Sequence, residues 1–207
     1  MLDVEETPAF KAWREALPDD RTRSRIAGRV ARVALGLLGD AKSVGGGVSE
    51  LRVDHGPGYR LYFTRRRQTV VILLCGGDKG TQARDIRLAR SHPTFEICMS
   101  IETMPYDVAD HLTHPEDQLD LIVDAVATGD PAVIRDALNI VARARGMTRV
   151  ARAAGVTREA LYKALGPDGD PRMSTLLGVF GALGVRLSVT AVAPPPADKA
   201  GDVDLAS

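Results

Sequence analysis

Basic side chains gather in residues 141–172, where two short helices are expected around a glycine turn. The first helix is predicted over 148–154 and the second over 157–165, with Ala154-Gly155-Val156 between them. Glycine permits the backbone geometry of a tight turn, and this spacing is typical of a helix-turn-helix. The second helix is short enough for the major groove of DNA, where its N-terminal residues would face base edges.

The outward side chains of these two helices are the candidate DNA contacts. On the second helix, Ala160, Leu161 and Leu165 are expected to face inward, which leaves the polar residues outward. Residues 141–172 hold seven basic and three acidic residues, as expected of a surface that contacts phosphates. The alternative is an ordinary helical bundle with a basic surface. The predicted DNA-binding residues are Thr148, Arg149, Thr157, Arg158, Tyr162 and Lys163.

The first half of the chain is expected to mix helices and strands. Thr7-Pro8 starts a helix, since a hydroxyl can cap it and proline suits its first position. A second helix should begin at Asp19 or Asp20, close at Gly39-Asp40 and form a hairpin with the first. Three strands joined by short turns then predict an antiparallel sheet. These strands are expected near 44–53, 59–64 and 69–75, and a further helix over 80–90.

The second half is expected to be helical. Prolines, glycines and caps divide residues 115–184 into five helices, and alternating apolar residues over 185–191 indicate a strand. The predicted fold class is α+β: a domain of helices and antiparallel sheet over 1–97, then an all-α domain with a C-terminal strand over 98–193. The tail over 194–207 is predicted to be disordered.

Charge is divided unevenly between the two halves. Residues 1–97 hold 17 basic and 12 acidic residues, whereas residues 98–207 hold 10 and 15. Acidic residues concentrate in 98–140, which has nine carboxylates against one arginine. This asymmetry indicates halves with different partners or halves that bind each other. In the second case, we expect the carboxylates to lie near Arg52, Arg60 and an arginine-bearing helix face. That face carries Arg21, Arg23, Arg25, Arg29 and Arg32.

The sequence favours a cytoplasmic protein that needs no cofactor or metal. Its longest apolar run, over 70–75, is far short of the roughly 20 residues of a membrane-spanning helix. The first residues are acidic and unlike a signal peptide. Cys75 is expected to be a buried thiol, and with Cys98 it suggests neither a disulfide framework nor a zinc site.

Several motifs of the second half occur together and cover residues 99 to about 192. They are Met104-Pro105-Tyr106-Asp107, Ala109-Asp110-His111-Leu112, Gly129-Asp130-Pro131, Ala142-Arg143-Ala144-Arg145-Gly146-Met147, Arg158 to Leu165, and Ala182-Leu183-Gly184. With these motifs the second half resembles HigA-like addiction-module antitoxins with an Xre-type helix-turn-helix. The resemblance implies a transcription repressor that neutralises a toxin and binds operator DNA, usually as a homodimer on two half-sites.

A second group of motifs covers residues 1 to about 90. They are Gly39-Asp40-Ala41-Lys42, Gly45 to Arg52, Gly58 to Phe63, and Leu73 to Lys79 followed by Gln82 and Asp85-Ile86. With them the first half resembles HigB-like toxins of the RelE/ParE superfamily. Toxin and antitoxin are usually separate chains, and here they are joined.

The resemblance implies an mRNA interferase, which cleaves messenger RNA on the ribosome. The ribose 2′-hydroxyl attacks the adjacent phosphate, so the protein must hold that phosphate, stabilise added negative charge and move protons. The predicted catalytic residues are Arg52 and Arg60 on adjacent strands, Lys79 after the third strand, and His55 in a turn. A histidine pKa near 6.5 suits proton transfer, although a loop histidine that is merely solvated is the alternative.

The sequence therefore predicts a toxin and antitoxin in one chain, with the ribonuclease silent while the two halves are in contact. Its expected partners are operator DNA, a second copy of the chain, and ribosome-bound mRNA once the toxin half is freed. The alternative is a DNA-binding repressor whose toxin half is inactive or, like the ParE type, inhibits gyrase. Fold alone does not separate these activities. The cationic cluster, by which we mean Arg52, Arg60 and Lys79, favours RNA cleavage.

Overall fold

The computed structural model describes residues 1–67, 69–91 and 102–189. In the first two ranges the elements are β1 Asp3–Glu6, α1 Pro8–Glu15, α2 Asp20–Ala34, β2 Lys42–Gly45, β3 Val48–Val53, β4 Tyr59–Arg66, β5 Val70–Gly77 and α3 Gln82–Ser91. In the third range they are β6 Met104–Pro105, α4 Val108–His111, α5 Pro115–Ala127, α6 Pro131–Arg145, α7 Met147–Ala153, α8 Arg158–Leu165 and α9 Met173–Ala182. The predicted α+β fold class is confirmed.

The described strands form one sheet in the order β2-β3-β4-β5-β1-β6. Neighbours from β2 to β5 are antiparallel, as predicted, with β2 added before the three expected strands. However, β1 lies parallel to β5, and β6 pairs antiparallel with β1. The prediction of a wholly antiparallel sheet was therefore wrong. It missed β1 because this short strand carries Asp3, Glu5 and Glu6 and has no apolar run.

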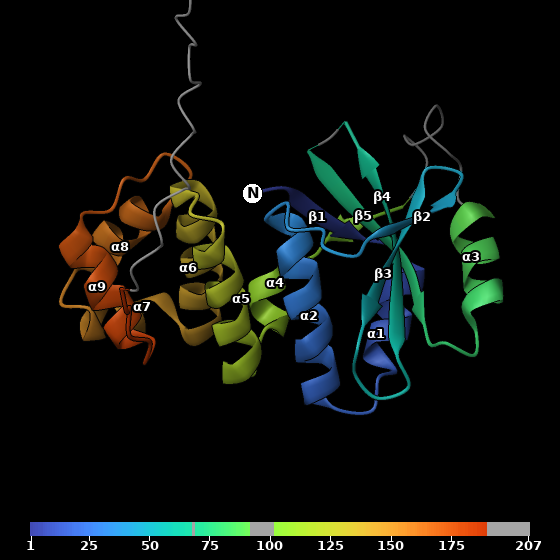
Figure 1. Cartoon of the computed structure of the whole chain (residues 1–207), viewed down its shortest axis with the longest axis horizontal. Helices are drawn as coiled ribbons and strands as arrows, with labels where there is room; N and C mark the ends of the chain where they lie inside the picture. Colours follow the sequence, from blue (N-terminus) through green and yellow to red (C-terminus); the bar gives the residue numbers. More distant parts are fainter. Residues whose placement is uncertain (68, 92–101, 190–207) are drawn as a thin grey trace, which may run out of the picture.

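Different helices cover the two faces of the sheet, with α3 on the side away from α2 (Figure 1). Side chains alternate along each strand, so neighbouring residues enter different cores. The core with α1 and α2 includes Leu51, Leu61, Val71 and Leu73. The core with α3 includes Tyr62, Ile72 and Leu74, and also Cys75, because the register between β4 and β5 shifts at this point and interrupts the alternation. Cys75 is buried as predicted, and burial raises the pKa of its thiol to about 12.

The starts of α1 and α2 follow their predicted caps. Thr7 and Asp19 each accept a hydrogen bond from the backbone N–H three residues further on. The helix α2 ends at Ala34, earlier than predicted, and Gly36 takes a left-handed φ of 82° just beyond it. The expected helical hairpin was wrong, because α1 packs on β5 whereas α2 packs on β3, α4 and α5.

In residues 102–189, the helices from Pro115 onward follow the prediction, but two other elements do not. The strand β6 contradicts an all-α second domain, and the short helix α4 was not expected. The predicted C-terminal strand was also wrong over 185–189, where the backbone is irregular and Val189 is fully exposed. No described strand lies beside this segment to complete its hydrogen bonds.

Some predictions concern residues outside the described ranges: Cys98, Ala191 and the tail over 194–207. The boundary between the domains predicted over 1–97 and 98–193 also falls there, so this division stays a prediction. Among the helices of the described ranges, none has the length and apolar character needed to cross a membrane.

Candidate functional sites

Arg52 and Arg60 lie directly opposite each other on β3 and β4, so their side chains share one face of the sheet. Glu50 precedes Arg52 by two residues on β3 and lies on the same face. Its side chain is 1% exposed, and its carboxylate is 3.5 Å from Arg52 Nε and 3.6 Å from Arg60 Nε. The structure therefore brings the two predicted arginines together beside a buried glutamate.

Two neutral side chains complete the surroundings of Glu50. The hydroxyl of Tyr62 donates to Glu50 Oε2 at 3.2 Å, and Gln82 Nε2 of α3 donates to the same oxygen at 2.8 Å. Burial first, and then the charge of Glu50, raise the pKa of the Tyr62 hydroxyl, so this group keeps its proton. Tyr62 is buried in the sheet, and its hydroxyl also orients the carboxylate.

Glu50 was not among the predicted site residues. The signal that could have found it is the spacing of Glu50 and Arg52, because residues two apart on a strand lie on the same face. An acidic residue between Val48 and Leu51 on a buried strand must have cationic or hydrogen-bonding partners.

Lys79 lies in the loop after β5, two residues beyond Gly77, which is the strand partner of Arg60. Its side chain is exposed and forms no ion pair within the described residues. The loop itself is fixed by Asp78, whose carboxylate accepts backbone hydrogen bonds from Gly80 and Thr81. Lys79 therefore follows the end of β5 that pairs with Arg60, and its role in the cluster stays a prediction.

His55 lies half-buried in the turn between β3 and β4. Within the described ranges its side chain forms no hydrogen bond with the Glu50 carboxylate or with either arginine. The pKa of Asp19 is lowered, mainly by the hydrogen bond from the Thr22 N–H and to a smaller extent by His55. The role of His55 in proton transfer therefore stays a prediction.

The helices α7 and α8 are joined by a short turn that contains Gly155, whose φ is +72°. This left-handed conformation favours glycine, as the sequence indicated. Thr157 begins α8 by accepting a hydrogen bond from the Ala160 N–H, so its hydroxyl acts as a helix cap. Leu161 and Leu165 are buried as predicted, but Ala160 is exposed.

Four of the six predicted DNA-binding residues line one hollow, which Asp110 and Arg143 also border. The guanidinium carbon of Arg158 lies 5.3 Å from the centre of the Tyr162 ring, in a cation–π contact at the surface. Lys163 is exposed on α8 but does not line the hollow. The lining residues among the predicted set are Thr148, Arg149, Arg158 and Tyr162.

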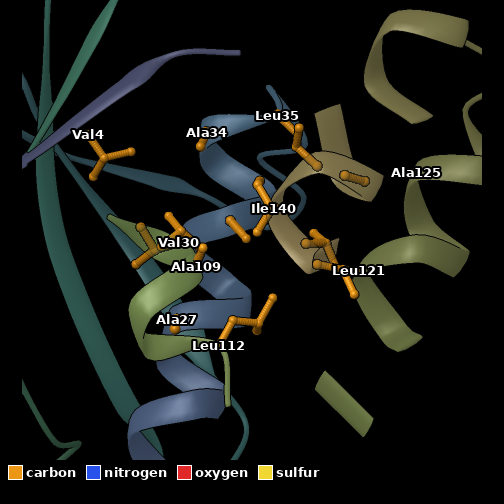
Figure 2. Packing of buried hydrophobic residues seen from close by; sticks show 14 of the residues in the cluster. Val4, Ala27, Val30, Ala34, Leu35, Ala109, Leu112, Leu121, Ala125 and Ile140 are labelled. Carbon is orange, nitrogen blue, oxygen red and sulfur yellow. The ribbon is translucent and has the colours of Figure 1, made fainter. Parts of the chain in front are cut away.

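The helix α2 is the part of residues 1–91 that the later helices cover most. It packs against α4 and α5, which lie between α2 and α6 (Figure 1). Figure 2 shows this packing from close by. The buried residues are Ala27, Val30 and Ala34 of α2, Ala109 of α4, Leu112 just after α4, Leu121 and Ala125 of α5, and Ile140 of α6. One apolar core therefore continues across both halves.

Beside this core, three arginines of α2 meet four carboxylates of α5. Arg25 Nε lies 3.0 Å from Asp117, which is buried, and Arg25 Nη1 lies 2.9 Å from Asp120. The other pairs are Arg21 with Glu116 and Arg32 with Asp124. The predicted contact between acidic residues and the arginine-bearing helix is confirmed for these side chains.

The rest of that prediction was wrong. Arg23 and Arg29 pair with Asp20 and Asp40 of their own half. Arg52 and Arg60 pair with Glu50, because they lie on the face of the sheet that packs against α3 rather than α2. The acidic helix α5 thus contacts α2, whereas Arg52 and Arg60 pair with a carboxylate of their own sheet.

The strand β6 forms a second contact between the halves. It extends the sheet beside β1, and the Tyr106 N–H donates to the Val4 carbonyl at 2.9 Å. The buried Tyr106 ring meets Phe10 edge-on at 6.2 Å and lies 5.6 Å from the guanidinium carbon of Arg14. The centres of the Tyr106 and His111 rings lie 4.8 Å apart with their planes tilted by 31°, and burial lowers the pKa of that histidine.

Residues 102–191 match a family model described as probable addiction module antidote protein. An uncharacterized protein of Haemophilus influenzae is 43% identical over 89 residues, which are 43% of this chain and 90% of that protein. The chain belongs to this antidote family. A second uncharacterized protein of the same organism is 39% identical over 92 residues, or 44% of this chain and 94% of its own length. No solved structure gives a significant match to the chain.

Membership makes the chain a component of a toxin–antitoxin system, and it implies an interaction with a toxin. We call residues 102–189 the antidote part and residues 1–91 the preceding part. In the structure, the antidote part makes both contacts described above, on α2 and at β1.

Proposed function

We propose that this chain carries a toxin in its preceding part and the matching antidote in its antidote part. The observation that carries the proposal is the docking of one on the other. An antidote acts by binding a toxin, and here the antidote part binds the α+β domain that precedes it. It does so through an apolar core, an arginine–carboxylate surface and a shared sheet.

The toxin activity we propose is RelE-type cleavage of messenger RNA on the ribosome. The 2′-hydroxyl oxygen would attack the adjacent phosphorus, and the 5′-oxygen of the next nucleotide would leave. Arg52 and Arg60 would hold this phosphate and stabilise the negative charge that develops on it, because guanidinium groups match phosphate oxygens in geometry and charge. Lys79, in the adjoining loop, would add a third cation. The HigB-like motifs and the convergence of the two arginines support this assignment.

The antidote part would silence the toxin without covering the cationic cluster. Arg52 has a side chain that is 50% exposed, while α2 and the β1 edge are covered. The antidote part would therefore obstruct access of the domain to the ribosome. Because the two parts share one chain, their contact is intramolecular, with an effective concentration on the order of millimolar.

The test is growth of cells that express residues 1–97, the full chain, or residues 1–97 with Arg60→Ala. We expect arrest only with the unsubstituted fragment, and relief when residues 98–207 are expressed beside it. No arrest from a folded fragment would reject the toxin proposal. Arrest that persists with Arg60→Ala would reject RNA cleavage by this cluster and favour gyrase as the target.

A second function is favoured by the hollow between α7 and α8: binding of operator DNA as an autorepressor, with the helices acting as a helix-turn-helix. Four exposed polar side chains gather there, in a stretch rich in arginine. A homodimer would place two such surfaces on two half-sites. We expect Arg158→Ala or Lys163→Ala to weaken binding of the full chain to DNA from upstream of its own gene. Unchanged affinity for both variants at moderate salt would reject this surface.

A further inference from the structure

The Glu50 carboxylate is held on all sides by its own domain. Both its oxygens face donors: Arg52 Nε lies nearest to Oε1, and Tyr62, Gln82 and Arg60 Nε lie nearest to Oε2. Burying a carboxylate is unfavourable unless charges and hydrogen bonds surround it, and here they come from β3, β4 and α3. The position of this group is therefore fixed by three elements at once.

Arg52 and Arg60 both approach the Glu50 carboxylate with the Nε side of the guanidinium group. In each case Nε is the closest nitrogen, which leaves the terminal nitrogens directed away from the carboxylate. Within the described residues, the terminal nitrogens of Arg52 donate to no protein acceptor, and those of Arg60 reach only the Gly58 carbonyl, at 3.3 Å. These contacts are ion pairs rather than hydrogen bonds, since within the described residues the buried Arg60 Nε has no hydrogen-bond acceptor. An arginine paired in this way keeps its terminal N–H groups for a ligand.

We propose that Glu50 is a positioning residue that aligns Arg52 and Arg60 as a clamp for a phosphate group. This inference deepens the proposed ribonuclease function and rests on it for the identity of the ligand, the phosphodiester of RNA. As a charge alone, Glu50 opposes anion binding, because it cancels part of the positive charge beside the site. Its benefit to the site is geometric: it directs two terminal N–H edges toward one phosphate.

The charge effect and the positioning effect of Glu50 predict opposite changes in phosphate affinity when the carboxylate is removed. In the full chain, Glu50→Gln removes the negative charge and keeps the shape of the side chain. If Glu50 is only a counter-charge, this variant binds a phosphate more tightly. If Glu50 positions the arginines, the variant binds more weakly, by about tenfold, because the two ion pairs that orient the arginines are lost.

The probe is adenosine 3′-monophosphate, titrated into the full chain while the Nε–Hε signals of Arg52 and Arg60 are followed by NMR. We expect the nucleotide to shift both signals in the unsubstituted chain, and Glu50→Gln to broaden them by exchange with water. The matched control is Asp54→Asn, which removes an exposed carboxylate two residues from Arg52. Its affinity should stay the same or rise.

Tyr62→Phe provides a second variant should Glu50→Gln fail to fold, which its thermal unfolding would show. It keeps the carboxylate charge but removes one hydrogen bond to it, and we expect about threefold weaker binding. Tighter binding by Glu50→Gln, or no binding by the unsubstituted chain at millimolar nucleotide, would overturn the clamp. If growth arrest still depends on Arg60 while Glu50→Gln leaves affinity unchanged, only the role of Glu50 is lost and the ribonuclease proposal stands.

Discussion

Arginines meet carboxylates in two regions of this molecule, and the two regions use the same pairing differently. On α2, Arg21, Arg25 and Arg32 bind acidic residues of α5, and these pairs border an apolar core between the halves. On the sheet, Arg52 and Arg60 share the buried Glu50 of their own half, and in each case Nε rather than a terminal nitrogen lies closest to that carboxylate. The first region can serve docking, and the second can serve a ligand.

The largest effect should come from the apolar part of the docking region. Leu112 is fully buried between α2 and α5. We expect Leu112→Ala to lower the free energy of unfolding of the full chain by about 2–5 kcal/mol, through lost burial and the cavity left behind. Urea denaturation measures this. The control is Leu119→Ala on the exposed side of α5, which should change it by less than about 0.5 kcal/mol. Equal effects would show that the halves do not share a core.

A smaller effect is expected where docking depends on charge. Arg25→Gln leaves the buried carboxylate of Asp117 without its cation, and should lower the free energy of unfolding by about 1–3 kcal/mol. Arg21→Gln removes an exposed pair with Glu116 and should cost less than about 1 kcal/mol. Both variants can be measured by urea denaturation at low and high salt. If the two cost the same, burial of Asp117 contributes nothing to docking.

The edge contact at β6 should respond to pH. Burial lowers the pKa of His111 in the folded chain, so below pH 6.5 the unfolded chain binds the proton more readily. Stability is therefore expected to be complete above this pH and to fall as the pH drops toward the folded pKa. Comparing urea midpoints at pH 7.5 and 5.5 tests this, and His111→Gln should reduce the difference. An unchanged difference would assign the pH dependence to other groups.

The smallest effect on stability is expected in the cationic cluster. The side chain of Arg52 is half exposed, and its one ion pair within the described residues is with Glu50, so Arg52→Gln should change the free energy of unfolding by less than about 1 kcal/mol. The same variant should lose most of its affinity for adenosine 3′-monophosphate. A large loss of stability would make Arg52 a structural residue and erase the difference between the two regions.

Most helices could be predicted from sequence because their signals are local. Capping residues such as Thr7 and Asp19 mark helix starts whatever surrounds them. The strands β1 and β6 could not be found this way. They are short, and only distant strands supply their hydrogen bonds: β5 for β1, and β1 for β6.

The candidate sites, too, could be predicted from sequence only in part. The convergence of Arg52 and Arg60 could be expected from adjacent strands, and the contact between α2 and α5 from charge. The error was to place the acidic helix beside both arginine groups. Alternation along β3 sends Leu51 toward α2, and Glu50 and Arg52 to the other face. Which face the antidote part covers depends on tertiary packing, which sequence periodicity does not report.

The central claim is that the antidote part holds a toxin silent by docking on α2. The most direct measurement is growth of cells that express the full chain with Leu112→Asp, which buries a charge in the core between the halves and leaves the preceding part unsubstituted. The control is the full chain with Leu119→Asp, at an exposed position. The account predicts growth arrest with Leu112→Asp only, and relief when Arg60→Ala is added to the same chain. Normal growth with Leu112→Asp, although limited proteolysis shows the antidote part released from a folded preceding part, would contradict it.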